Sequence, residues 1–348
     1  MEGFHRLRLA AVDGLTDDAV ALTFAVPDGL RQLFRFRPGQ HLTLRTELGG
    51  EDLRRTYSVC APTGGPLRVA VKRLDGGAFS TWACTQLQAG DEVEVLPPAG
   101  RFGPAVAASR RRRYGLVAAG SGITPVLSIA ATVLAVEPAS EVVLLYGNRT
   151  ARDVMLLEEL SDLKDRHPTR LQVLHVLSRE EQPSELLSGR LDPHRLGRLL
   201  DAFVPVASVD EWYLCGPFGL VTGARELLTA RGASSVHVEL FHAEAPPPRP
   251  PRPQGTAGET TVVAELHGRA STVTMDRDEK VLDAVLRVRV DAPYACRGGV
   301  CGTCRARVLE GAVEMDTNWA LEPDELATGV VLTCQSRPTT GVLRLAYL

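Results

Sequence analysis

The chain has 348 residues, with 39 Lys and Arg against 42 Asp and Glu, so its net charge at neutral pH is −3. This near balance gives no reason to expect binding to nucleic acid, and 44% hydrophobic residues are typical of a globular protein. At about 100–200 residues per domain, the length predicts two or three domains.

The N-terminal residues, MEGFHRLRLAAVDG, contain no apolar run of the length that a signal peptide needs. The uncharged stretch from Tyr114 to Val136 would be long enough to cross a bilayer. However, Gly120, Ser121, Gly122 and Pro125 interrupt its centre, so we interpret it as a buried strand followed by a turn and a helix. The sequence therefore predicts a cytoplasmic protein with no membrane partner.

Residues 1–108 are rich in short runs in which apolar and polar residues alternate, and Gly and Pro separate these runs. They lie at 19–26, 41–46, 67–74 and 91–96. Alternation with a period of two, combined with frequent turn residues, predicts an antiparallel β-barrel or sandwich. Only the run STWACTQL at 80–87 has a helical pattern.

Residues 109–243 change to continuous apolar strands that alternate with amphipathic helices. The strands are predicted at 114–119, 141–147, 171–177, 211–215 and 236–241. Five such strands with helical connections predict a doubly wound α/β domain around a parallel sheet.

A proline-rich segment, residues 244–258, follows the second domain. Proline occupies six of its positions, which predicts an extended, semi-rigid linker. Residues 259–348 form a third predicted domain, of the α+β class. It opens with strands at 260–266 and 271–275 and a short helix at 280–288, and a cysteine-rich loop comes next.

That loop reads YACRGGVCGTC, and a fourth cysteine lies near the end of the chain. Four thiolates in the spacing C-x4-C-x2-C, with a distant last member, are the ligand set of a plant-type [2Fe–2S] cluster. The predicted ligands are Cys296, Cys301, Cys304 and Cys334.

The three glycines of the loop, Gly298, Gly299 and Gly302, would let the backbone turn around the cluster at φ values that other residues resist. A structural zinc site would instead show two paired CxxC motifs. Disulfides are disfavoured in the cytoplasm. Plain buried cysteines would have no need to share one loop with three glycines, so the cluster is the favoured interpretation.

A second motif, AAGSGITPVLS at 118–128, follows a predicted strand and opens a predicted helix. Backbone N–H groups at the start of such a helix can bind phosphate. Gly120 and Gly122 are present, but Pro125 stands where the third glycine of a dinucleotide fingerprint belongs. Alone, the motif is equally compatible with an ordinary turn between a strand and a helix.

The ends of the next two strands indicate which nucleotide would bind. An NAD site needs an acidic residue after the second strand to hold the ribose 2′-hydroxyl, and the sequence there offers Arg149 instead. Ser178 and Arg179 follow the third strand. Two guanidinium groups and a hydroxyl suit a 2′-phosphate, although solvated surface arginines are the alternative. We therefore predict NADPH rather than NADH.

The fourth strand ends in YLCGP, which places Cys215, Gly216 and Pro217 at the carboxyl edge of the sheet. Ligands bind at this edge in α/β folds. A lone cysteine at the end of a strand is more often part of a core, so the prediction that it contributes to the site depends on this position.

A hydride carries two electrons and a [2Fe–2S] cluster accepts one, so a flavin is expected between them. The candidates in the first domain are RTYS at 55–58 and GGAFST at 76–81. Arg55 would pair with a phosphate, Tyr57 would lie against the flavin ring, and Ser58 would offer a hydroxyl near its reactive edge. The pyrophosphate would lie at the start of the helix, against Gly77, Ser80 and Thr81.

Together, RTYS, GSGITP, SREEQ and YLCGP resemble the ferredoxin–NADP reductase superfamily with a plant-type ferredoxin fused at the C-terminus. The similarity covers essentially the whole chain. It implies FAD rather than FMN, and a β-grasp fold for the third domain. It also implies hydride transfer near Ser58 and Cys215, with Thr124 close to the nicotinamide and with Glu239 and Phe241 near the flavin.

A narrower resemblance, to the reductase subunits of phenylacetyl-CoA epoxidases, is carried by residues 301–338, 34–46 and 188–192. It implies that the cluster delivers single electrons to a partner oxygenase, a separate diiron enzyme of aerobic phenylacetate breakdown. Two alternatives remain open. The chain could serve another oxygenase, such as a ring-hydroxylating dioxygenase or a hydroxylase, or it could be a redox-sensing interaction module.

Overall fold

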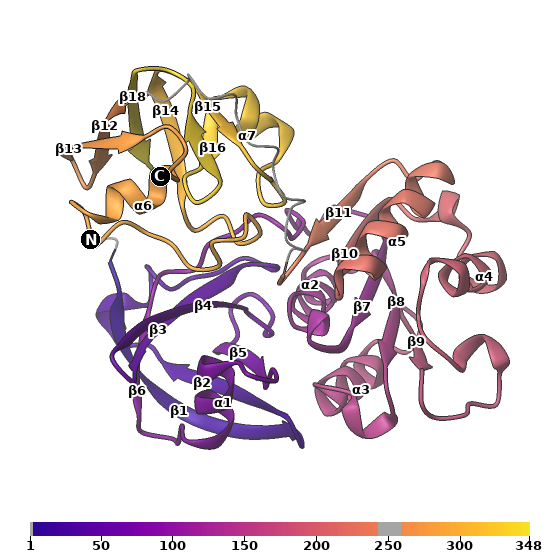
Figure 1. Cartoon of the computed structure of the whole chain (residues 1–348). Helices are drawn as coiled ribbons and strands as arrows, with labels where there is room; N and C mark the ends of the chain where they lie inside the picture. Colours follow the sequence, from indigo (N-terminus) through magenta and orange to yellow (C-terminus); the bar gives the residue numbers. More distant parts are fainter. Residues whose placement is uncertain (1–2, 243–258) are drawn as a thin grey trace. The chain divides into compact units, whose positions relative to one another are not determined.

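The computed structural model describes residues 3–242 and 259–348, so the predicted linker at 244–258 lies outside the described residues. The chain divides into two compact units (Figure 1). One consists of Phe4–Leu240, and the other of Phe241–Leu348 together with the first residues of the chain.

The N-terminal part of the first unit is an antiparallel sheet in the order β4-β3-β6-β1-β2-β5 (Figure 1). Its strands are β1 (His5–Thr16), β2 (Ala19–Ala25), β3 (His41–Leu48), β4 (Glu51–Ser58), β5 (Leu67–Lys72) and β6 (Glu92–Val95). A bridge between Val59 and Val69, and a 2.9 Å hydrogen bond from the Cys60 N–H to the Arg68 carbonyl, connect the end of β4 to β5. The sheet therefore closes into the predicted barrel.

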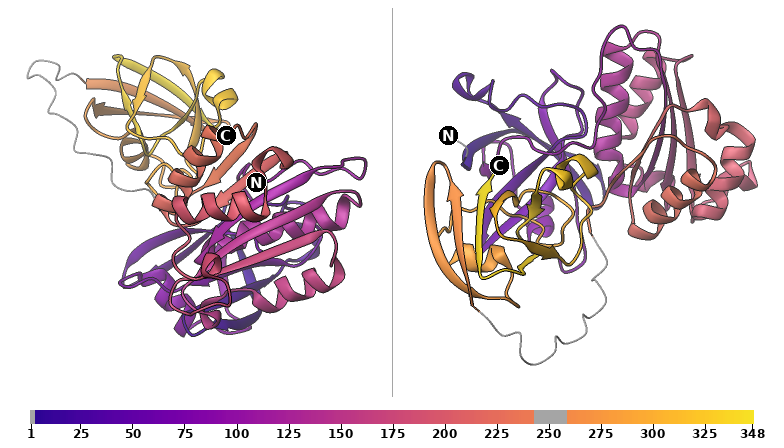
Figure 2. Two further views of the ribbon diagram at one scale, coloured as in Figure 1. Left: turned by 90° about the vertical axis from the view of Figure 1, so that its right-hand side faces the viewer. Right: turned by 90° about the horizontal axis from the view of Figure 1, so that it is seen from above.

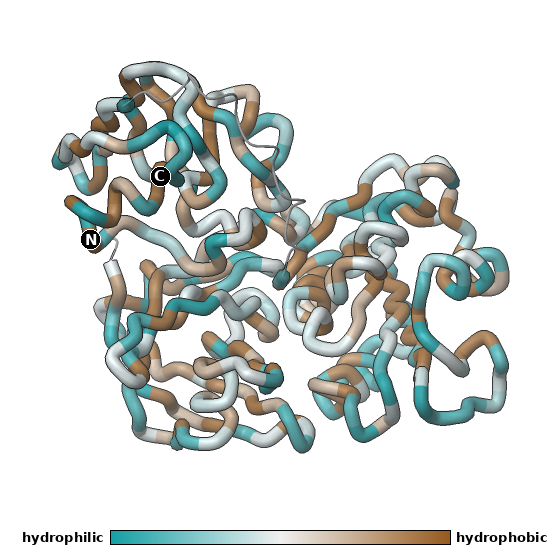
Figure 3. The backbone as a smooth tube through the Cα atoms, viewed as in Figure 1, coloured by the Kyte–Doolittle hydropathy of each residue, from teal (hydrophilic) through white to brown (hydrophobic). Residues whose placement is uncertain are grey.

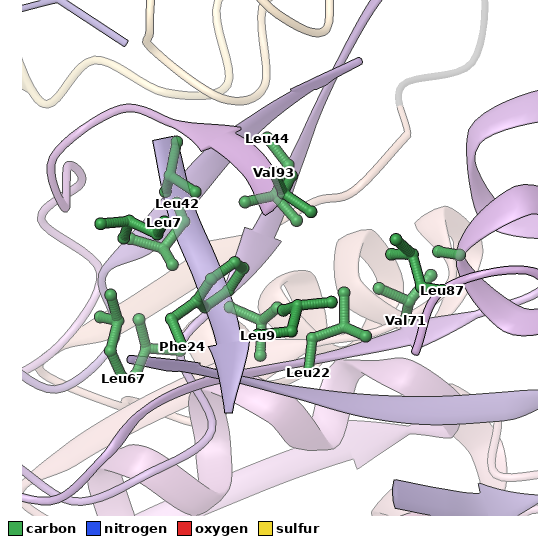
Figure 4. Close-up of a cluster of buried hydrophobic side chains, with 14 of the residues drawn as sticks. Leu7, Leu9, Leu22, Phe24, Leu42, Leu44, Leu67, Val71, Leu87 and Val93 are labelled. Atoms are coloured by element: carbon green, nitrogen blue, oxygen red, sulfur yellow. The ribbon is translucent and has the colours of Figure 1, made fainter. Parts of the chain in front are cut away.

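Alternate residues of these strands point into the barrel and belong to one hydrophobic core cluster (Figure 4). Leu7 and Leu9 of β1 and Leu42 and Leu44 of β3 are at most 1% exposed. Each buried leucine contributes about 1.5–3 kcal/mol to stability. The helix predicted at 80–87 is α1 (Ala78–Thr85), which contributes Phe79 to the same core.

The rest of the first unit is a parallel sheet in the order β11-β10-β7-β8-β9. Its strands are β7 (Arg113–Ala119), β8 (Glu141–Asn148), β9 (Leu171–Leu177), β10 (Glu211–Cys215) and β11 (Val236–Glu239). The helices between them are α2 (Ile123–Val136), α3 (Leu157–Arg166), α4 (Pro193–Phe203) and α5 (Phe218–Ala230). The strand order reverses direction after β9, and right-handed crossovers therefore place α2 and α3 on one face and α4 and α5 on the other (Figures 1 and 2).

The uncharged stretch at 114–136 forms β7, a turn and the buried helix α2, as predicted. Among the helices of the described residues, none has the length and hydropathy that crossing a bilayer would require.

The second unit is built on a mixed sheet in the order β13-β12-β18-β14-β16. Its strands are β12 (Glu259–Leu266), β13 (Arg269–Asp276), β14 (Arg305–Glu310), β16 (Val330–Leu332) and β18 (Val342–Tyr347), and β15 (Val313–Met315) pairs with β17 (Ser336–Pro338). β12 is antiparallel to β13 and parallel to β18.

The helix α6 (Val281–Leu286) packs on this sheet, and α7 (Pro323–Ala327) lies near β16. Hydrophobic and hydrophilic residues alternate along the strands (Figure 3), so that Val262, Ala264, Leu343 and Leu345 are fully buried. The α+β class predicted for the third domain is confirmed, and this arrangement is the β-grasp fold that the resemblance implied.

Candidate functional site

The barrel and the parallel sheet meet where β4 and β11 end. The Oγ of Ser58, at the end of β4, donates a hydrogen bond of 2.6 Å to Oε1 of Glu239, at the end of β11. Glu239 is in turn opposite Cys215 in the ladder between β10 and β11. The residues predicted to surround the hydride transfer, Ser58 and Cys215, therefore lie at one junction, with Glu239 between them.

Burial at this junction raises the pKa of both of its ionisable side chains. Burial raises the pKa of Glu239 to about 7, against a smaller lowering from the Ser58 hydrogen bond. Burial, reinforced by the carboxyl of Glu239, raises the pKa of the Cys215 thiol well above its usual value. Cys215 is thus a neutral thiol at physiological pH, whereas Glu239 changes charge near neutrality.

The loop between β7 and α2 packs directly on the end of β10. A Cβ at Gly122 would lie 2.1 Å from the carbonyl oxygen of Cys215, so only glycine fits there. Gly120 adopts φ +54°, a left-handed conformation that favours glycine. The two predicted nucleotide motifs, GSGITP and YLCGP, therefore form one surface at the carboxyl edge of the sheet.

The remaining predicted residues of this surface lie at the starts of α2 and α5. Thr124 is buried, and its hydroxyl donates to the Ser121 carbonyl over 3.0 Å. A Cβ at Gly216 would lie 3.2 Å from the backbone nitrogen of Ala119. Pro217 immediately precedes α5. Both helices thus begin at this edge, where the N–H groups of their first turns can face a phosphate.

The predicted 2′-phosphate residues come from two neighbouring strand ends. The N–H of Arg179 donates to the carbonyl of Arg149 over 2.7 Å, which places the two segments side by side. Both arginines are exposed and Ser178 is half-buried. Glu180 is also nearby, because its Oε2 accepts the Ala151 N–H at 2.8 Å. The rim therefore presents two exposed arginine side chains, and their contact with a phosphate stays a prediction.

The predicted flavin residues on β4 differ in how they are held. Arg55 is exposed, and its Nη1 donates to the Arg54 carbonyl over 2.8 Å. Tyr57 packs on Phe79, with ring centroids 5.6 Å apart. Burial raises the pKa of Tyr57 far above its usual value, so the phenol stays neutral. An exposed cation next to a fixed aromatic ring is an arrangement that suits a flavin and its phosphates.

The turn before α1 is held by Ser80, which is buried. Its Oγ accepts the Leu74 N–H and donates to the Gly77 carbonyl, both over 3.1 Å. A Cβ at Gly77 would lie 2.6 Å from this Oγ. Thr81 is exposed one residue later. Ser80 therefore shapes the turn, and Gly77 and Thr81 leave the start of the helix accessible.

Phe241 opens the second unit and is half-buried. Its predicted approach to the flavin stays a prediction.

The four predicted cluster ligands come together as two pairs. The thiols of Cys296 and Cys301 are hydrogen-bonded to each other, as are those of Cys304 and Cys334. Two pairs of thiolates would supply two sulfurs to each iron of a two-iron cluster.

The two thiols of each pair differ in acidity. The hydrogen bond from Cys301, helped by the Gly298 N–H at 3.3 Å, lowers the pKa of Cys296, while the same hydrogen bond and burial raise the pKa of Cys301. In the other pair, the hydrogen bond from Cys304 lowers the pKa of Cys334. Metal ligation requires thiolates, and Cys296 in the loop and Cys334 outside it are the members of the two pairs that ionise more readily.

The glycines of the loop do not all act as predicted. Gly299 and Gly302 have φ of +77° and +66°, but Gly298 is not left-handed. Arg297 takes the left-handed conformation instead, with φ +53°. Its guanidinium is held by Asp283 at 2.7 Å and lies over the Tyr294 ring, 4.6 Å from the centroid. These contacts offset the cost of a left-handed arginine, which is why glycine is not needed at that position.

Gln335 is a residue of this site that the sequence analysis did not identify. Its side-chain amide donates to the Arg297 carbonyl over 2.7 Å and to the Sγ of Cys334 over 3.5 Å. Gln335 is 6% exposed, so its two hydrogen bonds connect the cysteine loop to the fourth ligand in the interior of the domain. The sequence did offer one indication of this role, because Gln335 directly follows the predicted ligand Cys334. Hydrogen bonds to ligand sulfurs tune the reduction potential of such clusters.

Comparison with known families agrees with this geometry. Residues 6–103 match the oxidoreductase FAD-binding domain, residues 116–226 the oxidoreductase NAD-binding domain, and residues 264–339 the 2Fe-2S iron-sulfur cluster binding domain. The chain is therefore a flavin- and iron–sulfur-dependent oxidoreductase that uses a nicotinamide nucleotide. It belongs to the ferredoxin–NADP reductase superfamily, in the branch that carries a fused C-terminal ferredoxin domain.

Within that branch the chain is similar to one of the subunits of 1,2-phenylacetyl-CoA epoxidase of Escherichia coli (strain K12), with 45% identity over 98% of this chain and 97% of that protein. It is also 38% identical to the ferredoxin reductase component of 3-ketosteroid-9-alpha-monooxygenase of Mycobacterium tuberculosis (strain CDC 1551 / Oshkosh), over 98% of this chain and 95% of that one.

Among solved structures, phthalate dioxygenase reductase has the same fold, with a TM-score of 0.60 at 24% identity, covering 99% of this chain and 98% of that one. An intact type IV self-sufficient cytochrome P450 monooxygenase gives a TM-score of 0.73 at 24% identity, covering 98% of this chain but 41% of that one.

Proposed function

We propose that this chain is the NADPH-dependent reductase component of a multicomponent oxygenase. Electrons would pass from NADPH through FAD and the [2Fe–2S] cluster to a separate oxygenase that acts on phenylacetyl-CoA. The observation that carries this proposal is the 45% identity with the Escherichia coli 1,2-phenylacetyl-CoA epoxidase protein over 98% of the chain. Because that similarity includes the fused ferredoxin domain, it supports a shared electron acceptor as well as a shared donor.

A bound flavin supplies the link between the two-electron chemistry of a reduced nicotinamide and the one-electron chemistry of the cluster. The part of this chain is to hold nicotinamide and flavin within reach of each other. We place that meeting at the junction of Ser58 with Cys215 and Glu239, where the hydrogen bond of 2.6 Å joins the barrel to the parallel sheet. Thr124, at the start of α2, is proposed to lie beside the nicotinamide.

The domain assignments follow from the same proposal. The barrel at 1–108 would hold FAD, residues 109–243 would hold NADPH, the linker at 244–258 would join them to the ferredoxin domain, and residues 259–348 would hold the cluster. The proposed FAD contacts are Arg55, Tyr57, Ser58, Gly77, Ser80, Thr81 and Phe241. The proposed NADPH contacts are Gly120, Gly122, Thr124, Arg149, Ser178, Arg179, Cys215, Gly216 and Pro217.

Location follows from the same chemistry. The proposal places the chain in the cytoplasm, where thiols are kept reduced and remain free to bind iron.

A second acceptor has a specific observation in its favour. The ferredoxin reductase component of a 3-ketosteroid-9-alpha-monooxygenase is 38% identical over 98% of this chain. An oxygenase acting on a 3-ketosteroid is therefore the alternative partner for the same reductase chemistry.

Reconstitution decides between the two. The purified holoprotein and NADPH are combined either with the oxygenase components of a phenylacetyl-CoA epoxidase or with a 3-ketosteroid monooxygenase, and product is measured by mass spectrometry. We expect NADPH-dependent product only with the phenylacetyl-CoA components. Product only with the steroid enzyme would replace the proposed partner. Absence of NADPH-dependent cytochrome c reduction would refute the reductase function itself.

A further inference from the structure

Helix α2 is fixed to the barrel by two buried hydroxyl groups. The Oγ of Ser128 donates to the carbonyl of Ala61 over 2.7 Å, and the N–H of Thr63 donates to Oγ1 of Thr132 over 3.0 Å. Ser128 is 0% and Thr132 1% exposed, so both hydroxyl groups are buried, and the Ser128–Ala61 bond is buried as a whole, whereas Thr63 lies at the surface. Breaking a buried hydrogen bond costs free energy, because it leaves a polar group without a partner and away from water.

The two contacts have matching spacings on the helix and on the barrel segment. Ser128 and Thr132 are one turn apart, which is about 6 Å along a helix. Ala61 and Thr63 are two residues apart, a spacing that reaches at most about 7 Å in a chain. The segment is therefore bonded to α2 at two points that are one helical turn apart, and this restrains the helix from sliding or rotating against the barrel.

Both partners lead directly to the proposed transfer site. Ser128 is one turn after Thr124, the residue proposed to lie beside the nicotinamide. Ala61 is three residues after Ser58, and the chain between them is held by the Val59 N–H, which donates to the Gln40 carbonyl over 2.8 Å. The Ser128–Ala61 hydrogen bond thus joins the start of α2, on the proposed nicotinamide side of the site, to the end of β4, on the proposed flavin side.

The other end of α2 is held as firmly. Glu137 follows the helix and is fully buried. Its Oε1 accepts the N–H of Ala107, in the segment that joins the barrel to β7, over 3.1 Å. Its Oε2 accepts the hydroxyls of Tyr114 and Ser140 over 3.0 and 2.7 Å. The helix is therefore fixed along its length, and its start is the part that faces the ligand.

We propose that Ser128 and Thr132 are positioning residues for the reduction of the flavin by NADPH: they set the distance and angle between the nicotinamide held at the start of α2 and the flavin held by the end of β4. The inference rests on the proposed function. In this role α2 does more than cover the sheet, because its position sets the distance between the reacting groups. A displacement of about 1 Å between such groups can lower the rate about a hundredfold.

The test separates positioning from stability. Anaerobic stopped-flow experiments on the FAD-loaded holoprotein measure flavin bleaching over a range of NADPH concentrations. They yield the nucleotide dissociation constant and the limiting rate, with NADPH and with NADPH deuterated at C4. Ser128→Ala and Thr132→Val should each lower the limiting rate about tenfold or more with little change in the dissociation constant, and should enlarge the isotope effect.

Two further variants serve as matched comparisons. Thr132→Ser keeps the oxygen that accepts the Thr63 N–H and should stay within about twofold of the unaltered chain. Glu159→Gln weakens another contact between the two halves of the unit, the ion pair from Arg68 to α3 at 2.5 Å, on a helix with no proposed nucleotide contact. It should leave the limiting rate unchanged.

The outcomes are distinct. If Ser128→Ala and Thr132→Val lower only the melting temperature, with limiting rate and isotope effect unchanged, or if Glu159→Gln slows reduction equally, the positioning role is wrong. If Ser128→Ala fails to retain FAD, the limiting rates of Thr132→Val and Thr132→Ser decide the question: a slow Thr132→Val beside a normal Thr132→Ser supports positioning, and equal rates refute it. If NADPH does not bleach the flavin of the unaltered chain, the proposed function has failed, and the inference falls with it.

Discussion

The Oγ of Ser58 and the Oε1 of Glu239 are 2.6 Å apart, although 181 residues separate them along the chain. One side chain ends a strand of the antiparallel barrel, and the other ends the last strand of the parallel sheet. This hydrogen bond brings the proposed flavin side and nucleotide side of the site together, and it places a carboxyl group of unusual pKa at their meeting point.

The first prediction concerns that carboxyl. Burial raises the pKa of Glu239 from 4.5 to about 7. A carboxyl that holds its proton more tightly in the folded chain contributes most to stability below pH 4.5, and this contribution is lost as the pH rises to about 7. Glu239→Gln cannot titrate, so its melting temperature should fall less over this range than that of the unaltered chain.

Melting curves followed by circular dichroism at half-unit pH intervals measure this difference. Glu226→Gln, on an exposed part of α5, is the control and should keep the unaltered slope. An identical pH dependence for Glu239→Gln and the unaltered chain would show that Glu239 does not titrate as described.

The second prediction concerns the close contact between GSGITP and YLCGP. In Gly122→Ala the new methyl group would lie 2.1 Å from the Cys215 carbonyl, so the loop must move away from β10. We expect the dissociation constant for NADPH to rise more than about tenfold while FAD content stays normal. Gly14→Ala, at an exposed position of β1 with no proposed nucleotide contact, is the control, because nothing lies within 4 Å of a Cβ there. Unaltered NADPH affinity in Gly122→Ala would remove this loop from the nucleotide site.

The third prediction concerns nucleotide preference. A hydrogen bond to a charged group contributes about 1.5–3 kcal/mol. Arg149→Ala and Arg179→Ala should therefore each raise KM for NADPH about tenfold or more and leave KM for NADH nearly unchanged. Steady-state cytochrome c reduction with both nucleotides measures this, with Arg166→Ala at the end of α3 as the control. An equal rise for both nucleotides would mean that neither arginine recognises the 2′-phosphate.

The sequence predicted the parallel sheet well and the barrel less completely. Strands β7 to β10 lie within one residue of their predicted bounds, because strands buried on both faces are continuous apolar runs. Strand β4 was not predicted, since EDLRRTYS is rich in charged residues. A signal was nonetheless present: Gly49 and Gly50 have φ of +60° and +83°, and such a pair marks a tight hairpin between β3 and β4.

Contacts between distant segments were beyond sequence reasoning. The cysteine spacing indicated the cluster ligands, because the chemistry of metal binding is local to a short loop. The hydrogen bonds of Ser128 with Ala61 and of Gln335 with Arg297 depend on how the segments pack, and no periodicity records this.

The fourth prediction concerns the cluster environment. The amide of Gln335 donates to the Sγ of Cys334 over 3.5 Å, and a donor to a ligand sulfur stabilises the more negative, reduced cluster. Gln335→Leu should therefore lower the reduction potential. A tenfold change in the ratio of oxidised to reduced cluster corresponds to about 59 mV for one electron, and we expect a shift of up to about that size.

A redox titration followed by electron paramagnetic resonance measures this shift. Thr260→Val is the control, because it removes a hydrogen bond of 2.8 Å from a buried hydroxyl of the same domain to the Thr340 carbonyl, without touching a sulfur. A potential that moves equally in both variants, or in neither, would remove Gln335 from the control of the cluster.

The central claim is that four cysteines, arranged as two pairs, hold a cluster of two irons. Iron and acid-labile sulfide analysis of the anaerobically purified chain tests this most directly, with Cys334→Ser in parallel. We predict about two irons and two sulfides per chain, and their loss in Cys334→Ser. Zinc bound to these thiols, or protein that lacks acid-labile sulfide, would contradict the account.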